Sequence, residues 1–262
     1  MGHSKLWQVG VVAEEMVMGE KKVALISGAN KGIGLETGRQ LGKLGYTVLL
    51  GSRDAMKGEI AARRLRDEGV DARVVKLDVT RQADIDAAVK MVEKEFGALD
   101  VLVNNAGVMQ EKGWTQNTTS ETKLENLRAT FEANVFAVVA LTNALLPALK
   151  KAAAARIVNV SSILGSVSLQ ATPGSPTYGT KLFAYNSSKA ALNMFTVHLA
   201  HELRGTKIKV NSAHPGWVKT DLGGSAAPMD AVDGAKTEVE LATLAEDGPT
   251  GGFFHAGQAI AW

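Results

Sequence analysis

The stretch SGANKGIG at positions 27–34 decides the fold that this sequence predicts. It follows the apolar run VALI and precedes GLETGRQLGKLG, so it stands where a strand passes into a helix. Because Gly28, Gly32 and Gly34 have no Cβ, the chain can turn tightly and a pyrophosphate can approach the amides of the helix N-terminus. The spacing GxxxGxG differs from the common GxGxxG, which leaves a tight turn without a ligand as the alternative.

Short apolar runs alternate with amphipathic stretches along the rest of the chain. The apolar runs are nearly continuous, which is typical of strands covered on both faces. They are KVALIS (22–27), YTVLLGS (46–52), ARVVKLDV (72–79), LDVLVNNAG (99–107), ARIVNVSS (155–162) and IKVNSAHPG (208–216). The alternation predicts an α/β fold, a single Rossmann-type doubly wound parallel sheet with helices on both faces. Ligands bind beyond the carboxyl ends of such strands, so we expect the motifs at these ends to meet in one crevice.

The composition narrows the class of protein. The chain has 262 residues, of which 45% are hydrophobic and 21% are charged, as in an ordinary globular domain. A net charge of +2 predicts no general attraction to nucleic acid or to an acidic membrane. The absence of cysteine excludes disulfides, thiolate metal sites and cysteine nucleophiles. The apolar stretch 135–149 is interrupted by Thr142, Asn143 and Pro147, so we predict a buried helix there, no membrane span and a cytoplasmic location.

The first twenty residues differ from the rest of the chain, because they show no clear period. We predict an N-terminal extension over 1–20, either disordered or added to the natural protein, with Met18 as an alternative start. An additional N-terminal strand or arm is the other interpretation. The Rossmann-type domain is expected to span 21–262.

The residues at the end of the second predicted strand indicate which dinucleotide would bind. A bare ribose usually meets an acidic residue about 20 residues beyond the glycines. This sequence has Ser52 and then Arg53 there, which leaves room for a 2′-phosphate and supplies a guanidinium for it. Lys31 adds a second cation, so we predict NADP (NADPH) rather than NAD; ordinary surface cations are the alternative. Asp54 would repel the phosphate if it turned inward.

The stretch YNSSK brings a phenol and an ammonium one helical turn apart. Tyr185 and Lys189 stand at i and i+4, which puts them on one helix face, and a nearby cation lowers the pKa of a phenol. Ser161 or Ser162, at the end of a predicted strand, can orient a carbonyl oxygen beside them. A solvated helix face is the alternative. A second pair, in YGTK at 178–181, lies among prolines and glycines, so we expect a loop there.

Together these motifs resemble the short-chain dehydrogenase/reductase family over residues 22–262, closest to its NADP-dependent carbonyl reductase branch. The likeness also includes LDV (77–79), NNAG (104–107) and HPGWVKTD (214–221). It implies a catalytic set of Asn134, Ser162, Tyr185 and Lys189. It also implies a cofactor site of Gly28, Asn30, Lys31, Gly32, Ile33, Gly34, Arg53, Asp78, Val79, Asn105, Ala106, Gly107, Tyr185, Lys189, Pro215, Gly216, Val218 and Thr220.

The resemblance further implies that NADPH gives a hydride to a ketone or aldehyde. Ser162 would then hydrogen-bond the carbonyl oxygen and Tyr185 would donate the proton. Lys189 would lower the pKa of Tyr185 and hold the nicotinamide ribose, and Asn134 would support Lys189 through water. An NAD-dependent alcohol dehydrogenase, a 3-ketoacyl reductase and a non-catalytic cofactor-sensing protein are the alternatives. The expected partner is a small carbonyl or alcohol substrate.

The oligomeric state is left open by two features of the sequence. The predicted helix over 131–151 is apolar nearly all round, which favours a homo-oligomer, either a dimer or a tetramer. The segment between Ser162 and Tyr185 is longer than in the shortest family members, and some carbonyl reductases with a larger insertion there are monomers. No metal site is predicted, because His198 and Glu202 share a helix face without further ligands nearby.

Overall fold

The computed structural model describes residues 21–111, 113 and 118–262, and the prediction for residues 1–20 lies outside them. These residues build one sheet in the order β3-β2-β1-β4-β5-β6-β7-β8, parallel except for the last pairing, β7 with β8. The strands are β1 Val23–Ile26, β2 Thr47–Ser52, β3 Ala72–Lys76, β4 Val101–Asn104, β5 Arg156–Val160, β6 Lys209–Ala213, β7 Phe253–His255 and β8 Gln258–Ala259.

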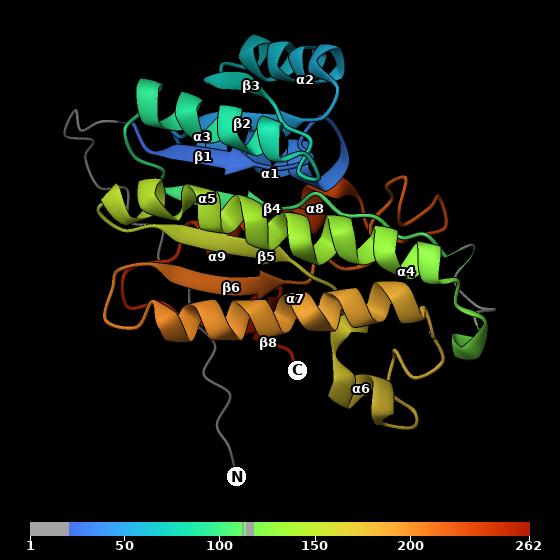
Figure 1. Ribbon diagram of the computed structural model, residues 1–262. Coiled ribbons are helices and arrows are strands. Elements are labelled where there is room, and N and C mark those ends of the chain that lie inside the picture. Colours follow the sequence, from blue (N-terminus) through green and yellow to red (C-terminus); the bar gives the residue numbers. More distant parts are fainter. Residues whose placement is uncertain (1–20, 112, 114–117) are drawn as a thin grey trace.

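The helices cover both faces of this sheet, and α3, α5 and α7 lie across its front in Figure 1. They are α1 Gly32–Lys43, α2 Ala55–Asp67, α3 Gln82–Glu95, α4 Leu124–Phe131, α5 Ala137–Lys151, α6 Val167–Ala171, α7 Phe183–Glu202, α8 Ala231–Gly234 and α9 Lys236–Ala242. Two 3₁₀ turns, η1 Thr119–Glu121 and η3 Ile163–Gly165, and one π-helical turn, η2 Glu132–Phe136, complete the described elements.

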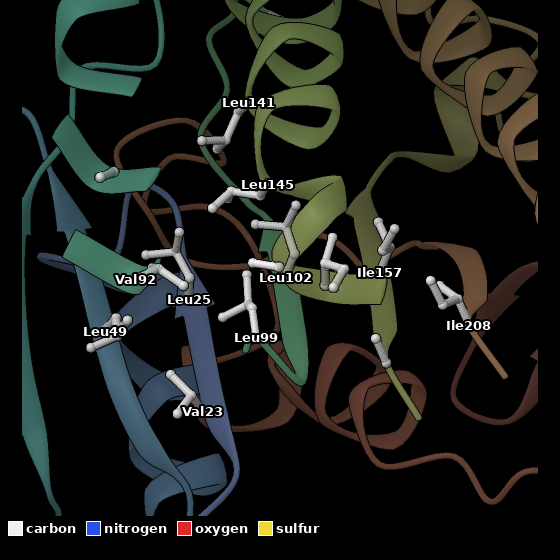
Figure 2. Close-up of a cluster of buried hydrophobic side chains, with 14 of the residues drawn as sticks. Val23, Leu25, Leu49, Val92, Leu99, Leu102, Leu141, Leu145, Ile157 and Ile208 are labelled. Atoms are coloured by element: carbon white, nitrogen blue, oxygen red, sulfur yellow. The ribbon is translucent and has the colours of Figure 1, made fainter. Parts of the chain in front are cut away.

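The strands are apolar on both faces because each face meets its own helices. Leu25 and Leu49 point into a core with α3, α5 and α7, and Figure 2 shows them beside Leu141 and Leu145 of α5. The next residue along β1, Ile26, points the other way, into a core with α1, α2 and α9. The period of two along a strand therefore sends neighbouring residues into different cores, which accounts for the nearly continuous apolar runs.

The order of the strands creates the crevice. From β1 the chain proceeds to β2 and β3 on one side, and then returns to place β4, β5 and β6 on the other. The two loops that follow β1 and β4 diverge at this point, so a ligand can lie between them at the carboxyl ends of the strands. The doubly wound parallel sheet predicted from the sequence is confirmed.

The predicted helix over 131–151 is longer than expected, since it begins at Leu124 and includes the π-helical turn η2. By length and composition alone, Leu124–Lys151 is apolar enough to cross a membrane, and 44% of its most apolar window is buried inside the protein. Its buried side packs on the sheet between α3 and α7. The absence of a membrane span stays a prediction.

The segment between Ser162 and Tyr185 folds into η3, α6 and a series of turns. Tyr178 lies in one of these turns and is 44% exposed, as the loop prediction for YGTK required. The backbone N–H of Ser168 in α6 donates to the carbonyl oxygen of Trp262 at 2.9 Å, so the last described residue supports this insertion.

Candidate active site

One large cavity, of about 1170 Å³, opens at the carboxyl ends of the strands. Every residue predicted to bind the cofactor lines it, as do Ser162, Tyr185 and Lys189; Asn134 lies behind its wall. Motifs from seven parts of the chain therefore meet in one crevice. Further lining residues were not predicted as site residues from the sequence: Thr80, Val108, Ile163, Leu164, Pro176, Thr177, Thr180 and Leu222.

The glycines of the loop after β1 are required partly by its packing on another loop. A Cβ on Gly34 would stand 2.4 Å from Nδ2 of Asn105, and one on Gly28 would stand 3.0 Å from Cα of Ala106. Asn105 Nδ2 donates to the carbonyl oxygens of Ser27 (2.8 Å) and Gly28 (3.1 Å), which ties the two loops together. No side chain caps the N-terminus of α1 at Lys31, so its first amides are left for an anion.

The charged residues at this end of the cavity are exposed to solvent. Among the described residues Arg53 has no ion-pair partner. Asp54 also lines this end of the cavity, and its Oδ1 accepts from the backbone N–H of Lys57 at 3.0 Å and caps α2. That bond lowers the pKa of Asp54. Lys31 forms an ion pair with Asp221 across the mouth of the cavity, a contact that the sequence did not predict.

Tyr185 and Lys189 lie on one face of α7 at the other end of the cavity, where both are buried. Nζ of Lys189 is 5.6 Å from the centroid of the Tyr185 ring and donates to the carbonyl oxygen of Val160 at 2.8 Å. The side chain of Ser162 acts on the phenol of Tyr185 and lowers its pKa, while its Oγ accepts from the backbone N–H of Leu164 at 3.2 Å. Ser161 instead donates to the backbone oxygen of Lys189 at 3.5 Å, so the structure distinguishes the two serines.

Burial controls the protonation of this pair. It raises the pKa of Tyr185 to about 12, against the hydrogen bond to Ser162, which lowers it. It lowers the pKa of Lys189 to about 8, against the charge of Glu238, which raises it. The sequence predicted a lowered pKa for Tyr185 from the ammonium one turn away. In this structure burial is the largest effect, so the net pKa of Tyr185 lies above its ordinary value.

Asn134 lies in the π-helical turn η2, and π-helical turns inside α-helices often occur at functional sites. Its Oδ1 accepts from the backbone N–H of Val108 at 2.8 Å, and its Nδ2 donates to the oxygens of Val108 (2.9 Å) and Ser188 (3.0 Å). A Cβ on Gly107 would stand 3.2 Å from Asn134 Oδ1 and 3.5 Å from Lys189 Nζ. Asn134 thus fixes the loop after β4 against α7, and its support of Lys189 through water stays a prediction.

His214 forms an apolar part of the cavity wall rather than a charged one. Burial and the neighbouring His255 lower its pKa to about 3, so the ring is neutral at physiological pH. The two rings lie 4.8 Å apart between centroids, and Nδ1 of His214 accepts from the backbone N–H of Gly216 at 3.4 Å. Met229 packs beneath Gly216, where a Cβ would stand 2.9 Å from its sulfur. Met229 is therefore a packing residue.

The cavity thus joins two kinds of chemistry. One end offers uncapped backbone amides and exposed cations, which suit a phosphorylated ligand. The other end offers a buried phenol that stays protonated at neutral pH and can hydrogen-bond or protonate an oxygen.

Comparison with known proteins agrees with this arrangement. The family model for short chain dehydrogenase matches residues 22–231. Short-chain dehydrogenase anuI of Penicillium roqueforti is 37% identical over 230 residues, covering 85% of this chain and 89% of that protein. NADPH carbonyl reductase 1 of Mus musculus is 32% identical over 280 residues, covering 92% and 99%. The structure of an NADPH-bound carbonyl reductase from chicken fatty liver superposes with a TM-score of 0.79 at 30% identity, covering 92% of this chain and 99% of that one.

Proposed function

The chain belongs to the short chain dehydrogenase family of oxidoreductases, close to its carbonyl reductases, and on this premise we propose that it reduces ketones or aldehydes with NADPH. The family uses a nicotinamide cofactor; the preference for NADPH and the role of Tyr185 as proton donor belong to the proposal. The observation that carries the proposal is the burial of Tyr185 and Lys189 at the end of the cavity opposite the exposed cations.

The protonation of Tyr185 supports reduction as the favoured direction. A phenol whose pKa is raised to about 12 carries its proton at neutral pH and is ready to give it to an oxygen. Oxidation of an alcohol would need the phenolate, which burial opposes. Ser162, which lines the same end of the cavity and acts on the same phenol, would orient a carbonyl oxygen beside it.

The residues at the other end fit a dinucleotide with a 2′-phosphate. The amides at the start of α1 would hold the pyrophosphate, and Arg53, with no ion-pair partner among the described residues, would hold the 2′-phosphate. The carboxylate of Asp54 is held by Lys57 through the cap of α2, which leaves the guanidinium of Arg53 without an ion-pair partner among the described residues. The bound cofactor supplies the hydride. The names of the mouse relative and the chicken structure, both of which specify NADPH, support the same preference.

The chain's own residues then have distinct tasks. The apolar walls formed by Ile163, Leu164 and Leu222 exclude water from the reacting end. Ser162 holds the carbonyl oxygen, and the Tyr185 hydroxyl donates its proton to that oxygen. Lys189 stays beside the ring because Val160 fixes its ammonium.

Tyr185→Phe tests this proposal most directly. We expect NADPH-dependent reduction of a panel of aldehydes and ketones to fall by about 10²- to 10⁴-fold, because the proton donor is lost. Binding of NADPH, followed by its fluorescence, should stay within about twofold. Tyr178→Phe is the matched control, since Tyr178 lies in an exposed turn outside the cavity lining. Full turnover by Tyr185→Phe would reject the mechanism.

Arrangement into dimers or tetramers and a cytoplasmic location stay predictions from the sequence. Exposed apolar side chains on two neighbouring helical elements, Phe136 of η2 and Met194 of α7, support association, since each is 57% exposed. Size-exclusion chromatography with light scattering tests it, and a strictly monomeric mass would contradict it.

A further inference from the structure

The helix that carries Tyr185 and Lys189 receives its N-terminal cap from a distant segment. Leu182, which precedes α7, offers no side-chain hydrogen bond, and the first turn of the helix contains no acidic residue. Oε1 of Glu111 fills this role, because it accepts from the backbone N–H of Tyr185 at 3.0 Å, across 74 residues of sequence. The bond reaches the backbone amide of Tyr185 itself. It therefore fixes the backbone position from which the phenol side chain extends.

The other oxygen of the same carboxylate is unusual. Oε2 of Glu111 is buried and has no hydrogen-bond partner among the described residues. When one oxygen of a buried carboxylate lacks a hydrogen bond, little water screens the negative charge. The electrostatic field of that charge then acts on neighbouring groups. Glu111 accordingly adds to the effect of burial and raises the pKa of Tyr185, against the hydrogen bond to Ser162.

The segment that carries Glu111 is held firmly upstream of it. The backbone N–H of Asn105 donates to Oγ of Ser27 at 3.0 Å, and Val108 makes two hydrogen bonds with the side chain of Asn134. The loop after β4 therefore connects the glycine loop, the π-helical turn and the N-terminus of α7. A displacement of Glu111 would be transmitted to Tyr185 through a single hydrogen bond.

Other titratable or polar groups around the phenol come from α7, α9, the loop after β6 and the end of β5. Lys189 faces the ring from α7 itself, and Glu238 of α9 acts on Lys189. His214, which lines the same cavity after β6, is neutral. The end of β5 contributes the uncharged Ser162. Glu111 is thus the acidic side chain that acts directly on Tyr185 among the described residues.

We propose that Glu111 is a positioning residue for the reduction: its carboxylate fixes the first turn of α7 through the amide of Tyr185 and places a negative charge close to the buried phenol. This inference rests on the proposed function only for its effect on turnover. The hydrogen bond and the charge act on Tyr185 whether or not a carbonyl compound is the substrate.

Two substitutions separate the hydrogen bond from the charge. Glu111→Gln keeps an oxygen that can accept from the amide and removes the charge, whereas Glu111→Ala removes both. Glu125→Gln, on the exposed surface of α4, is the control for a charge change alone. The protein has three tyrosines, so NMR of isotope-labelled tyrosine Cζ should give three signals, and Tyr185→Phe identifies the one that belongs to Tyr185.

In Glu111→Gln we expect Tyr185 to ionise at lower pH, so that its phenolate fraction at about pH 10 rises severalfold, while the melting temperature stays close to that of the parent. In Glu111→Ala we expect a lower melting temperature and a kcat reduced about tenfold, with the affinity for NADPH unchanged. A merely structural cap would leave the tyrosine titration of Glu111→Gln unmoved.

A Tyr185 titration in Glu111→Gln that superimposes on the parent would reject the role of the charge. A parental kcat and melting temperature in Glu111→Ala would reject the role of the hydrogen bond. If Glu111→Ala does not fold, its failure supports the cap and the titration of Glu111→Gln still decides the charge. The titration needs no substrate, so a parent protein that reduces no carbonyl compound would reject the proposed function without touching this result.

Discussion

The two ends of the cavity differ in how far water reaches their charged groups. At the nucleotide end the side chains of Lys31 and Asp221 are 65% and 79% exposed, and they pair across the cavity mouth. At the opposite end Tyr185 and Lys189 are 6% and 5% exposed. Each end therefore pairs a cation with a polar or acidic group. One pair is in contact with water and the other is in a low-dielectric environment, although both lie in one cavity.

This difference decides which effect controls each end. Burial moves the pKa values of Tyr185 and Lys189 to about 12 and about 8, so both groups shift towards their neutral forms. Solvent screens the exposed pair at the other end, where an ion pair contributes about 1 kcal/mol or less. We therefore expect substitutions at the buried end to have the larger effects, and four experiments test that order.

Lys189→Met should have the largest effect. The substitution removes the ammonium that lies beside the Tyr185 ring and donates to Val160. We expect kcat for carbonyl reduction to fall by about 10²- to 10³-fold in steady-state assays. Lys181→Met is the matched control, because Lys181 lies 4.8 Å from the ring centroid of Tyr178 in an exposed turn. Equal losses in the two variants would remove the distinction between the ends.

Glu238→Gln should change how stability depends on pH. Burial raises the pKa of Glu238 to about 8 from its ordinary value of 4.5, so the folded protein holds this proton over a range in which the unfolded chain releases it. The stability of the parent should therefore fall as pH rises from about 4.5 to about 8, by a few kcal/mol in order of magnitude. Glutamine does not ionise, so the melting temperature of the variant relative to the parent should rise across that window.

The control for this experiment is Glu240→Gln, two positions further along α9 and partly exposed. Its melting temperature should follow that of the parent at every pH. A constant difference between Glu238→Gln and the parent from about pH 5 to about pH 8 would show that burial does not hold the proton on Glu238.

Arg53→Ala should have a moderate effect confined to the cofactor. Loss of a guanidinium that pairs with a 2′-phosphate should weaken NADPH binding by about tenfold and leave NADH binding nearly unchanged. Kinetics with both cofactors measure this, and Arg63→Ala on the exposed surface of α2 is the control. A preference of the parent protein for NADH would overturn the assignment of the cofactor.

Asp221→Asn should have the smallest effect. The substitution releases Lys31 from its exposed ion pair and removes a negative charge from the nucleotide end. We expect NADPH to bind about two- to threefold more tightly at low ionic strength, and the gain to disappear as salt is added. A fluorescence titration at two salt concentrations measures it. A gain that persists in high salt would mean that this pair is less screened than its exposure implies.

Much of the fold and of the site is predictable from the sequence, because each motif is local and most of them come directly after a strand. The glycines of residues 27–34, Arg53, and the pair of Tyr185 and Lys189 are all identified by their place after a strand or by their spacing on a helix. Carboxyl ends of parallel strands share one edge of a sheet, so the convergence of these motifs was also predictable, and the cavity contains them.

The structure alone decided contacts between segments that no spacing connects. These include the cap that Glu111 provides to Tyr185 and the pairing of Lys31 with Asp221. It also decided that burial sets the net direction of the Tyr185 pKa. A local pattern specifies which groups are neighbours along a helix, whereas the exclusion of water that governs their ionisation depends on what the rest of the chain packs around them.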